Sequence, residues 1–262
     1  MKSRKTDKWR LKEKRGQGYG ENYKPWILVH EVPSDGRSHK IYGWKHNRTY
    51  HFLSDGEFYA FLRLQKQDNV LDIREQFPLL PLQDTLDIAK KNGICHPPIT
   101  KSDDKDKNIL TSDLNILVSN GSEVKEIVRT VKTEADLKKT RTQEKLFIEK
   151  EYWTKKGIDW GIILHTEESK VIGNNIYQIY QDYFWTEDKN LTDEELNWLV
   201  DRFKDMLIKN DMVIHKTTQT FEKSLEWREG EGLNFFKFLL AHKIIKTDFT
   251  IKFNYFDMKI WF

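Results

Sequence analysis

Two neighbouring segments of alternating polar and apolar residues place the strongest constraint on the fold of this chain. NILTSDLNILV (108–118) and EVKEIVRTVK (123–132) are separated by Ser119-Asn120-Gly121-Ser122, a combination typical of a β-hairpin. The second strand runs on to Lys132 and is followed at once by TEADL, which reads as a helix start. Because a half-buried strand normally stops at a turn residue, Lys132 is either a solvated strand end or an ammonium with a function.

The segments around this hairpin predict a mixed sheet flanked by helices, which is an α/β fold. Each element is predicted from its periodicity and its turn residues. In chain order we expect a strand over 25–33, a hairpin over 37–53, a helix over 54–67, a strand over 69–79, a helix over 84–94, a polar loop over 96–108, the hairpin described above, a helix over about 134–156 and a strand over 159–164.

The last third of the chain has a different character. It predicts amphipathic helices over 170–185, 191–210, 217–227 and 233–245, and the second begins with a Thr192-x-x-Glu195 capping box. TDFTIKFNYFDMKIWF then predicts two short strands, and helices followed by a terminal ribbon are the outline of a winged helix. We therefore expect a basic arm over 1–20, an α/β domain over 21–167 and a helical, winged-helix-like domain over 168–262.

The predicted arm carries a strong positive charge. Residues 1–20 contain eight Lys or Arg against two acidic residues, whereas the whole chain has a net charge of only +3. Such a segment suits contact with a phosphate backbone, although a solvated, flexible terminus would have the same composition. The candidate DNA-binding residues are Arg4, Lys5, Lys8, Arg10, Lys14 and Arg15.

Composition limits the classes of protein and the cellular compartments that fit this chain. Cys95 is the only cysteine, so an intramolecular disulfide or a Cys-rich zinc module is excluded, and the neighbouring Cys95-His96 pair is interpreted as structural. No apolar run reaches the roughly 18–20 residues of a membrane span, and the N-terminus is charged rather than signal-like. We expect a soluble, cytoplasmic protein.

Glu57 is the first candidate for chemistry. Glu57, Ala60, Phe61 and Leu64 share one helix face, so the carboxylate lies on an apolar stripe. Buried glutamates are rare unless they are paired or bound to a metal. The alternative is structural, because Ser54 and Glu57 also form an S-x-x-E capping box.

Asp113 and Lys132 are the second and third candidates, one on each strand of the hairpin. A carboxylate on one strand, and a lysine two places after a polar side chain on the next, is the layout of the PD-(D/E)XK nucleases. In that chemistry two carboxylates and a main-chain carbonyl hold Mg²⁺, which activates water, and the lysine offsets charge in the transition state. The alternative for Asp113 is an outward-facing position on a half-exposed strand.

The turn decides whether these two residues can meet. A two-residue turn at Asn120-Gly121 would pair Asp113 with Val128 and leave Lys132 four residues further along, about 13 Å away at ~3.3 Å per residue. Direct opposition of Asp113 and Lys132 needs a longer loop centred near 122–123, or a bulge. We expect the site to require this second register.

Three other charged residues are accessory candidates. Glu149 shares an inward face of the long helix with Trp153, although the simpler interpretation is an i,i+4 pair with Lys145. Arg74 and Glu75 lie near a sheet end, where they either shape the site or form a structural salt bridge.

Eight segments together resemble a known family, TnsA, the endonuclease subunit of the heteromeric Tn-seven-type transposases. The resemblance covers essentially the whole N-terminal domain, and the C-terminal part resembles the family mainly in outline. The segments that carry it are RGQGYGENYKPW (15–26), EVPSDGRSHKIY (31–42), LSDGEF (53–58), LDIREQFPL (71–79), HPPI (96–99), TSDLNI (111–116), TVKTEADL (130–137) and EKLFIEKEYW (144–153).

The resemblance implies a restriction-endonuclease-like catalytic domain over 21–167. It also implies a Mg²⁺-dependent nuclease, for which Mn²⁺ can substitute, that cuts the non-transferred strand at the 5′ ends of a transposon. The family's acidic helix residue, strand aspartate and lysine fall on Glu57, Asp113 and Lys132. The family's further metal ligand, typically Gln or Glu, falls on Thr130, a weaker ligand, for which the main-chain carbonyl of Val131 can compensate.

The partners implied by the resemblance are double-stranded DNA at transposon ends, a DDE transposase subunit like TnsB, and an AAA ATPase regulator like TnsC that contacts the C-terminal domain. No membrane partner is expected. Two other functions fit the same residues. One is a free-standing restriction or repair nuclease of the same fold, and the other is a non-catalytic DNA-binding assembly factor, which the threonine at 130 would permit.

Overall fold

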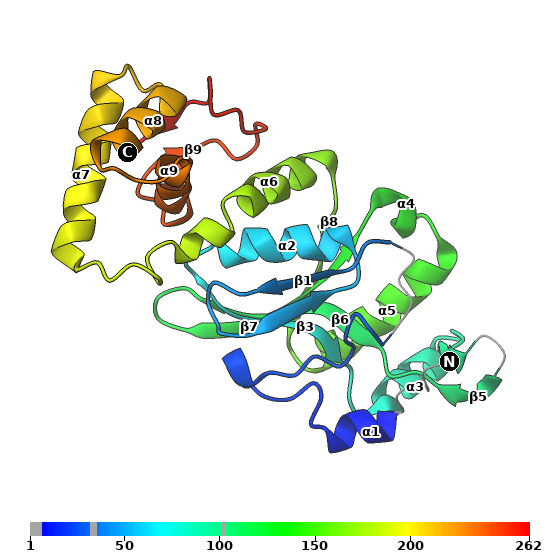
Figure 1. The fold of residues 1–262 in the computed structure, drawn as a ribbon. Coiled ribbons are helices and arrows are strands. Elements are labelled where there is room, and N and C mark those ends of the chain that lie inside the picture. Colours follow the sequence, from blue (N-terminus) through cyan, green and yellow to red (C-terminus); the bar gives the residue numbers. More distant parts are fainter. Residues whose placement is uncertain (1–6, 32–35, 101–102) are drawn as a thin grey trace. The chain divides into compact units, whose positions relative to one another are not determined.

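The computed structural model describes residues 7–31, 36–100 and 103–262 (Figure 1). The chain forms two compact units, Met1–Thr166 and Glu167–Phe262. The first unit is the α/β part predicted from the sequence, and the second is mainly helical. None of the helices in the described ranges is long and apolar enough to span a bilayer.

A four-stranded mixed sheet forms the centre of the first unit. Its order is β3 (Val70–Pro78), β6 (Thr111–Ser119), β7 (Val124–Lys132) and β8 (Asp159–Leu164). The first three strands pair antiparallel, and β8 pairs parallel to β7. The parallel pair needs a crossover, which the helical segment between the two strands supplies.

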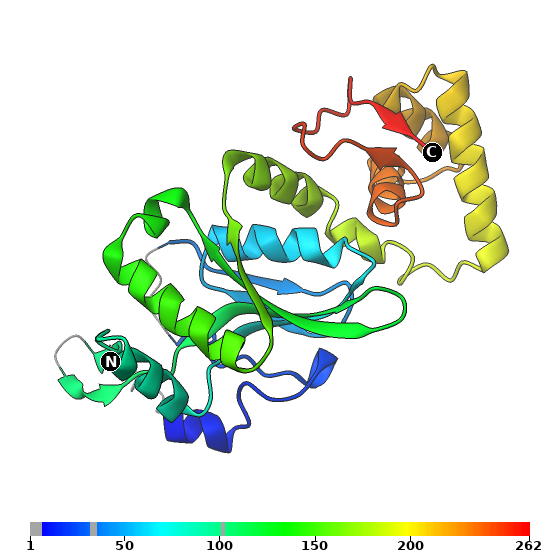
Figure 2. The same cartoon turned by 180° about the vertical axis from the view of Figure 1, so that it is seen from behind.

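Helices cover both faces of this sheet (Figures 1 and 2). On one face lies α2 (Asp55–Gln65), packed with the separate hairpin of β1 (His39–Tyr42) and β2 (Thr49–Phe52) through Tyr50, Phe52 and Phe61. On the other face, α5 (Thr140–Lys155) packs beside α3 (Leu82–Lys91) and places Trp153 in a core with Val128 and Phe77.

Three predicted elements of this unit differ from the structure. Residues 25–31 form bends and turns instead of a strand, because Trp26 is buried and its N–H donates to the Gln76 carbonyl. The predicted polar loop contains β4 (Pro98–Thr100) and β5 (Asp103–Lys107), which pair with each other. The long helix predicted over about 134–156 is divided into two helices, α4 (Glu134–Leu137), which has Thr133 as its N-cap and Lys138 as its C-cap, and α5.

The described part of the predicted basic arm is folded into the first unit. It contains α1 (Asp7–Lys12) and a 3-10 turn, η1 (Gly20–Asn22). Arg10 and Arg15 are buried, at 3% and 8% exposure, and both approach Glu31. The segment is therefore anchored by charge pairs in the interior, which its composition alone did not predict.

The second unit contains α6 (Glu167–Gln178), η2 (Gln181–Phe184), α7 (Asp193–Lys209), α8 (Ile214–Ser224), α9 (Glu231–Ala241), β9 (Lys246–Thr247) and β10 (Ile260–Trp261). The predicted capping box of α7 is present. The core of the second unit is aromatic and contains Phe203, Phe221 and Phe235. The terminal strands are only two residues long, so the ribbon is shorter than predicted. The α9 helix, which precedes this ribbon, is largely buried.

Candidate active site

Asp113 lies where β6 and β7 separate. The regular pairing of the two strands continues to Leu114↔Arg129 and stops there. Beyond that pair the Asp113 carboxylate accepts a hydrogen bond from the main-chain N–H of Val131, with an oxygen–nitrogen distance of 2.7 Å. The Asp113 side chain therefore replaces the main-chain carbonyl that would accept from this N–H in a regular strand pair, and the bond fixes the carboxylate near the end of β7.

The hairpin register lies between the two that the sequence suggested. Ser119 pairs with Val124 around a turn over 120–123, which places Asp113 opposite Thr130. The prediction that the site requires Asp113 directly opposite Lys132 was wrong. Lys132 lies two residues further along the same face, and its long side chain spans the diagonal, so that Nζ is 3.0 Å from Asp113 Oδ2.

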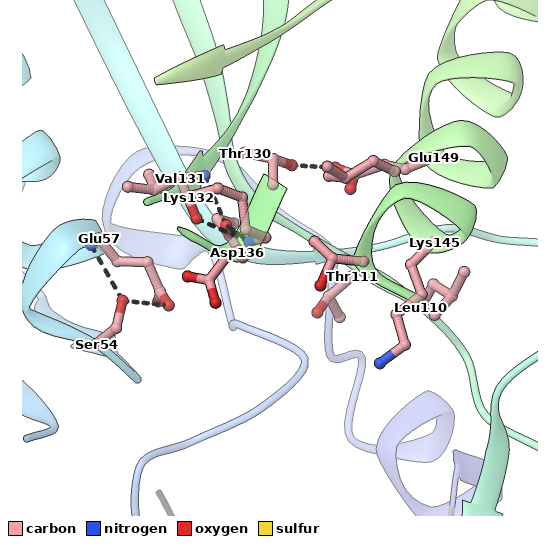
Figure 3. Close-up of a pocket in the computed structure, with 13 residues that line it drawn as sticks. Ser54, Glu57, Leu110, Thr111, Thr130, Val131, Lys132, Asp136, Lys145 and Glu149 are labelled. Atoms are coloured by element: carbon pink, nitrogen blue, oxygen red, sulfur yellow. Dashed lines mark hydrogen bonds and ion pairs between the residues drawn. The ribbon is translucent and has the colours of Figure 1, made fainter. Parts of the chain in front are cut away.

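Glu57 combines the two roles that the sequence offered as alternatives. Ser54 caps α2 by accepting from the Glu57 N–H, and its hydroxyl donates to Glu57 Oε1 at 2.8 Å (Figure 3). The same carboxylate is buried and lines one pocket with Asp113 and Lys132. Gly56 allows α2 to lie close to β7, because a Cβ there would be only 3.1 Å from Val131 Cγ1 and would crowd it.

Gln76 supports Glu57 from β3 and was missed by the sequence reasoning. It is buried and in the left-handed region, with φ of 49°, which is costly for a residue with a side chain. Its amide donates to Glu57 Oε2 at 2.9 Å and accepts from the Thr111 hydroxyl at 3.3 Å. Gln76 stands directly after the noted Arg74 and Glu75, but the left-handed conformation that aims it has no sequence signal.

Glu149 points into the site from α5 and does not form the expected pair with Lys145. It is buried, and it accepts a hydrogen bond from the Thr130 hydroxyl (Figure 3). Thr130 is thus committed to a carboxylate, and the carbonyl of Val131 accepts from Lys132 Nζ at 2.8 Å. Both of the weaker predicted metal ligands are engaged with groups of the site itself.

Negative charge exceeds positive charge at the centre of this pocket, a cavity of about 400 Å³. Burial, and then the charge of Asp113, raise the pKa of Glu57 to about 7 and that of Glu149 to about 7. Burial lowers the pKa of Lys132, but the adjacent Asp113 outweighs it and the net shift is upward. A group of carboxylates with raised pKa values is the electrostatic setting that favours a bound cation.

The donors present fit a hard divalent cation that keeps several waters. Within residues 7–31, 36–100 and 103–262, no three Asp, Glu, His or Cys side chains form a group that could hold a metal ion. Of the carboxylates that line the pocket, Glu149 is bonded to Thr130 and Asp136 is paired with Lys139, which leaves Glu57 and Asp113 as the candidate carboxylate ligands, with the Val131 carbonyl at the same pocket. Mg²⁺ is characteristically bound through one or two carboxylates with water completing its octahedron, so this donor set suits it.

The other predicted site residues lie away from the pocket. Arg74 bonds to Glu126 and Asn115, and Glu75 pairs with Arg48 at 2.7 Å, so both form structural salt bridges. Among the DNA-binding candidates, Lys8 and Lys14 are exposed, whereas the burial of Arg10 and Arg15 contradicts a surface contact. Arg4 and Lys5 lie outside the described residues. His96 is buried against Thr85, in keeping with its structural interpretation.

The central mixed sheet, with a carboxylate on α2, a second on β6 and a lysine at the end of β7, defines a restriction-endonuclease-like domain. Comparison with known proteins gives the family. Residues 67–165 match the model described as TnsA-like endonuclease N terminal, and residues 169–249 match that described as TnsA endonuclease C terminal. Together the two matches cover more than half of the chain, which belongs to the TnsA endonuclease family.

A curated relative agrees with this family. The chain is 45% identical over 171 residues to the protein named Transposon Tn7 transposition protein TnsA from Escherichia coli. That match covers 65% of this chain and 60% of the relative, so the chain spans about three fifths of the length of the curated protein it matches.

Proposed function

We propose that this chain is the DNA endonuclease subunit of a Tn7-type transposase and hydrolyses the non-transferred strand at the 5′ ends of the transposon. The observation that carries the proposal is the meeting of Glu57, Asp113 and Lys132, from three different elements, in one polar pocket. Membership of the TnsA family and the name of the curated relative supply the context of DNA transposition.

The three residues divide two tasks in this reaction. Glu57 and Asp113 would hold Mg²⁺, or Mn²⁺ in its place, together with the Val131 carbonyl. When bound, such a cation supplies Lewis-acid polarisation of the phosphodiester and activation of water. Lys132 presents its ammonium beside Asp113, where it offsets negative charge that develops on the phosphate.

The surrounding residues keep these groups in position. Ser54, Gln76 and the Leu53 N–H fix both oxygens of Glu57, and the Val131 N–H fixes Asp113. Because orientation of the ligands is set by such neighbours, the geometry is built before substrate arrives. Glu149 and Thr130 form the wall of the pocket on the α5 side.

The proposed partners follow from transposition. Double-stranded DNA at the transposon ends is the substrate, and a TnsB-like DDE transposase subunit cuts and joins the other strand. We assign the contact with a TnsC-like ATPase regulator to the second unit. The largely buried α9 supports a role for this unit in assembly rather than in reading DNA bases.

Cleavage of end-labelled transposon DNA, with partner subunits and Mg²⁺, tests the proposal. Asp113→Asn keeps an oxygen that can accept from the Val131 N–H and so preserves the fold, and it should abolish cutting of the non-transferred strand, as should Asp113→Ala and Lys132→Ala. Asp159→Asn is the matched control, because Asp159 is an exposed aspartate of the same sheet that pairs with Arg129. Full double-strand excision by the Asp113 variants would refute the assignment.

The same assay separates the other two functions. A free-standing nuclease would cut DNA as a purified chain without partner subunits. An assembly factor would support the partner's strand transfer equally well with Asp113 intact or replaced, and it would leave the non-transferred strand uncut in both cases.

A further inference from the structure

Lys145 is a second lysine in the candidate active site, and its ammonium is uncommitted. It lines the pocket from α5, and Figure 3 shows it on the side opposite Ser54 and Glu57. The Lys132 ammonium, by contrast, is bonded to both Asp113 and the Val131 carbonyl. Across the part of the chain that the structure describes, Lys145 has no hydrogen-bond or ion-pair partner.

The carboxylates that could neutralise Lys145 are directed elsewhere. Glu149, one helical turn away, turns inward to Thr130. Glu144 pairs with Arg141 at 2.5 Å, and Asp136, which also lines the pocket, pairs with Lys139 at 2.7 Å. Lys145 and Glu149 have the i,i+4 spacing of a helix surface pair, but the Glu149 carboxylate is bonded to Thr130, so this helix presents an unpaired cation to the pocket.

The electrostatic surroundings of Lys145 support an anionic ligand. Burial, and then the charges of Arg141 and Lys132, lower the pKa of its ammonium, which shows that the protein gives it no compensating negative charge. A phosphate oxygen provides such a charge, and a lysine contacts phosphate as a flexible point charge. The pocket that Lys145 and Glu57 both line is a cavity of about 400 Å³, which is large enough to take in a backbone phosphate.

We propose that Lys145 binds a phosphate of the DNA strand that enters the pocket, next to the phosphate that is cut. This inference rests on the proposed endonuclease function and names a substrate-binding residue for it. Lys145 holds the strand, whereas Lys132 acts at the reacting phosphate. Because its contact is made equally before and during the reaction, Lys145 contributes to KM rather than to kcat.

The test compares Lys145→Ala, Lys145→Arg and Lys150→Ala. Lys150 is the matched control, because it is exposed on the same helix and does not line the pocket. The affinity of each full-length variant for a short transposon-end duplex is measured by fluorescence anisotropy in Ca²⁺, from 50 to 200 mM salt. Circular dichroism confirms that each variant is folded.

Lys145→Ala should weaken binding roughly 5- to 10-fold at the lowest salt and reduce the slope of log Kd against log salt by about one phosphate contact. Lys145→Arg should keep the wild-type slope, and Lys150→Ala should match wild type in both quantities. In the cleavage assay Lys145→Ala should raise KM with little change in kcat.

Equal affinity and slope for Lys145→Ala and wild type would overturn the inference, as would an equal loss in Lys150→Ala or no measurable binding of DNA by the wild type. These results are independent of the proposed reaction. If the wild type binds DNA and Lys145→Ala binds it less well, but neither cuts in the presence of Mg²⁺ and partners, the reaction is wrong and the phosphate contact stands.

Discussion

Two of the regions in which the first unit buries charge are balanced differently. In the middle of β3, Arg48 pairs with Glu75 and Arg74 pairs with Glu126, so each guanidinium has its own carboxylate. At the end of β7, Lys132 stands among Glu57, Asp113 and Glu149, and of these carboxylates only Asp113 is in contact with it.

The difference separates structure from function. A balanced pair satisfies its own charges, and removing one partner exposes the cost of burying the other. An unbalanced cluster is held together by the fold in spite of its electrostatics, and it gains stability only when a cation arrives. From the sequence, Arg74 and Glu75 could either shape the site or form a structural salt bridge, and their pairing with Glu126 and Arg48 supports the second alternative.

The strongest test of this contrast is Glu57→Gln. An amide keeps one oxygen for the N–H donors of Leu53 and Gln76, and its NH₂ can face the Ser54 hydroxyl, so the fold should persist. Without the carboxylate charge, we expect cleavage to fall by roughly 10³-fold. A thermal denaturation midpoint at or above that of the wild type, measured with the cleavage rate, would agree. A much lower midpoint would show that Glu57 is mainly structural.

Arg48→Met tests the balanced region. It leaves Glu75 buried without its guanidinium, and we expect the free energy of unfolding to fall by about 3–5 kcal/mol in urea denaturation. Replacing both residues, as in Arg48→Met with Glu75→Leu, should recover part of this loss, because no uncompensated charge remains. If the single variant were as stable as the wild type, the pair would not hold the scaffold together.

Gln76→Ala tests the link between the two regions. Removing the amide takes away one of the two donors to Glu57 Oε2 and leaves the Leu53 N–H alone to hold this oxygen. The affinity for Mn²⁺, measured by isothermal titration calorimetry, should therefore fall roughly 10- to 100-fold with a similar loss of cleavage. Gln65→Ala is the control, because Gln65 is also buried and accepts from the Trp44 N–H, but it does not line the pocket. An equal effect of the two substitutions on metal affinity would contradict the positioning role.

The smallest expected effect concerns the imidazole of His51, a residue whose main-chain N–H donates to Glu75. Burial, and then the nearby Lys40, lower the pKa of His51 to about 4. The unfolded chain therefore binds a proton that the folded chain refuses between about pH 6.5 and 4, so stability falls as pH decreases through this window. Since the ring is only partly buried, we expect His51→Gln to remove about 1–2 kcal/mol of this loss in unfolding measured across the window. Identical pH profiles would exclude the effect.

The sequence predicted the elements of the site better than their contacts. Periodicity was sufficient to find α2, the β6–β7 hairpin and the shared face of Asp113 and Lys132. Periodicity could not predict the hydrogen bond between Thr130 and Glu149, because the rotation of α5 over the sheet depends on tertiary packing. The left-handed Gln76 has no signature in the residue order. A strand was predicted over 25–33, and the described part of it, 25–31, forms bends and turns, since alternation cannot distinguish sheet pairing from the burial of one tryptophan.

The hydrogen bond from the Val131 N–H to Asp113 makes this amide a natural reporter. Its chemical shift depends on the charge of the carboxylate it donates to, and the bond is independent of any substrate. A backbone NMR signal at the end of β7 would therefore follow loading of the site by any cation, in solution and without cleavage. Site occupancy could then be titrated separately from DNA binding and from catalysis.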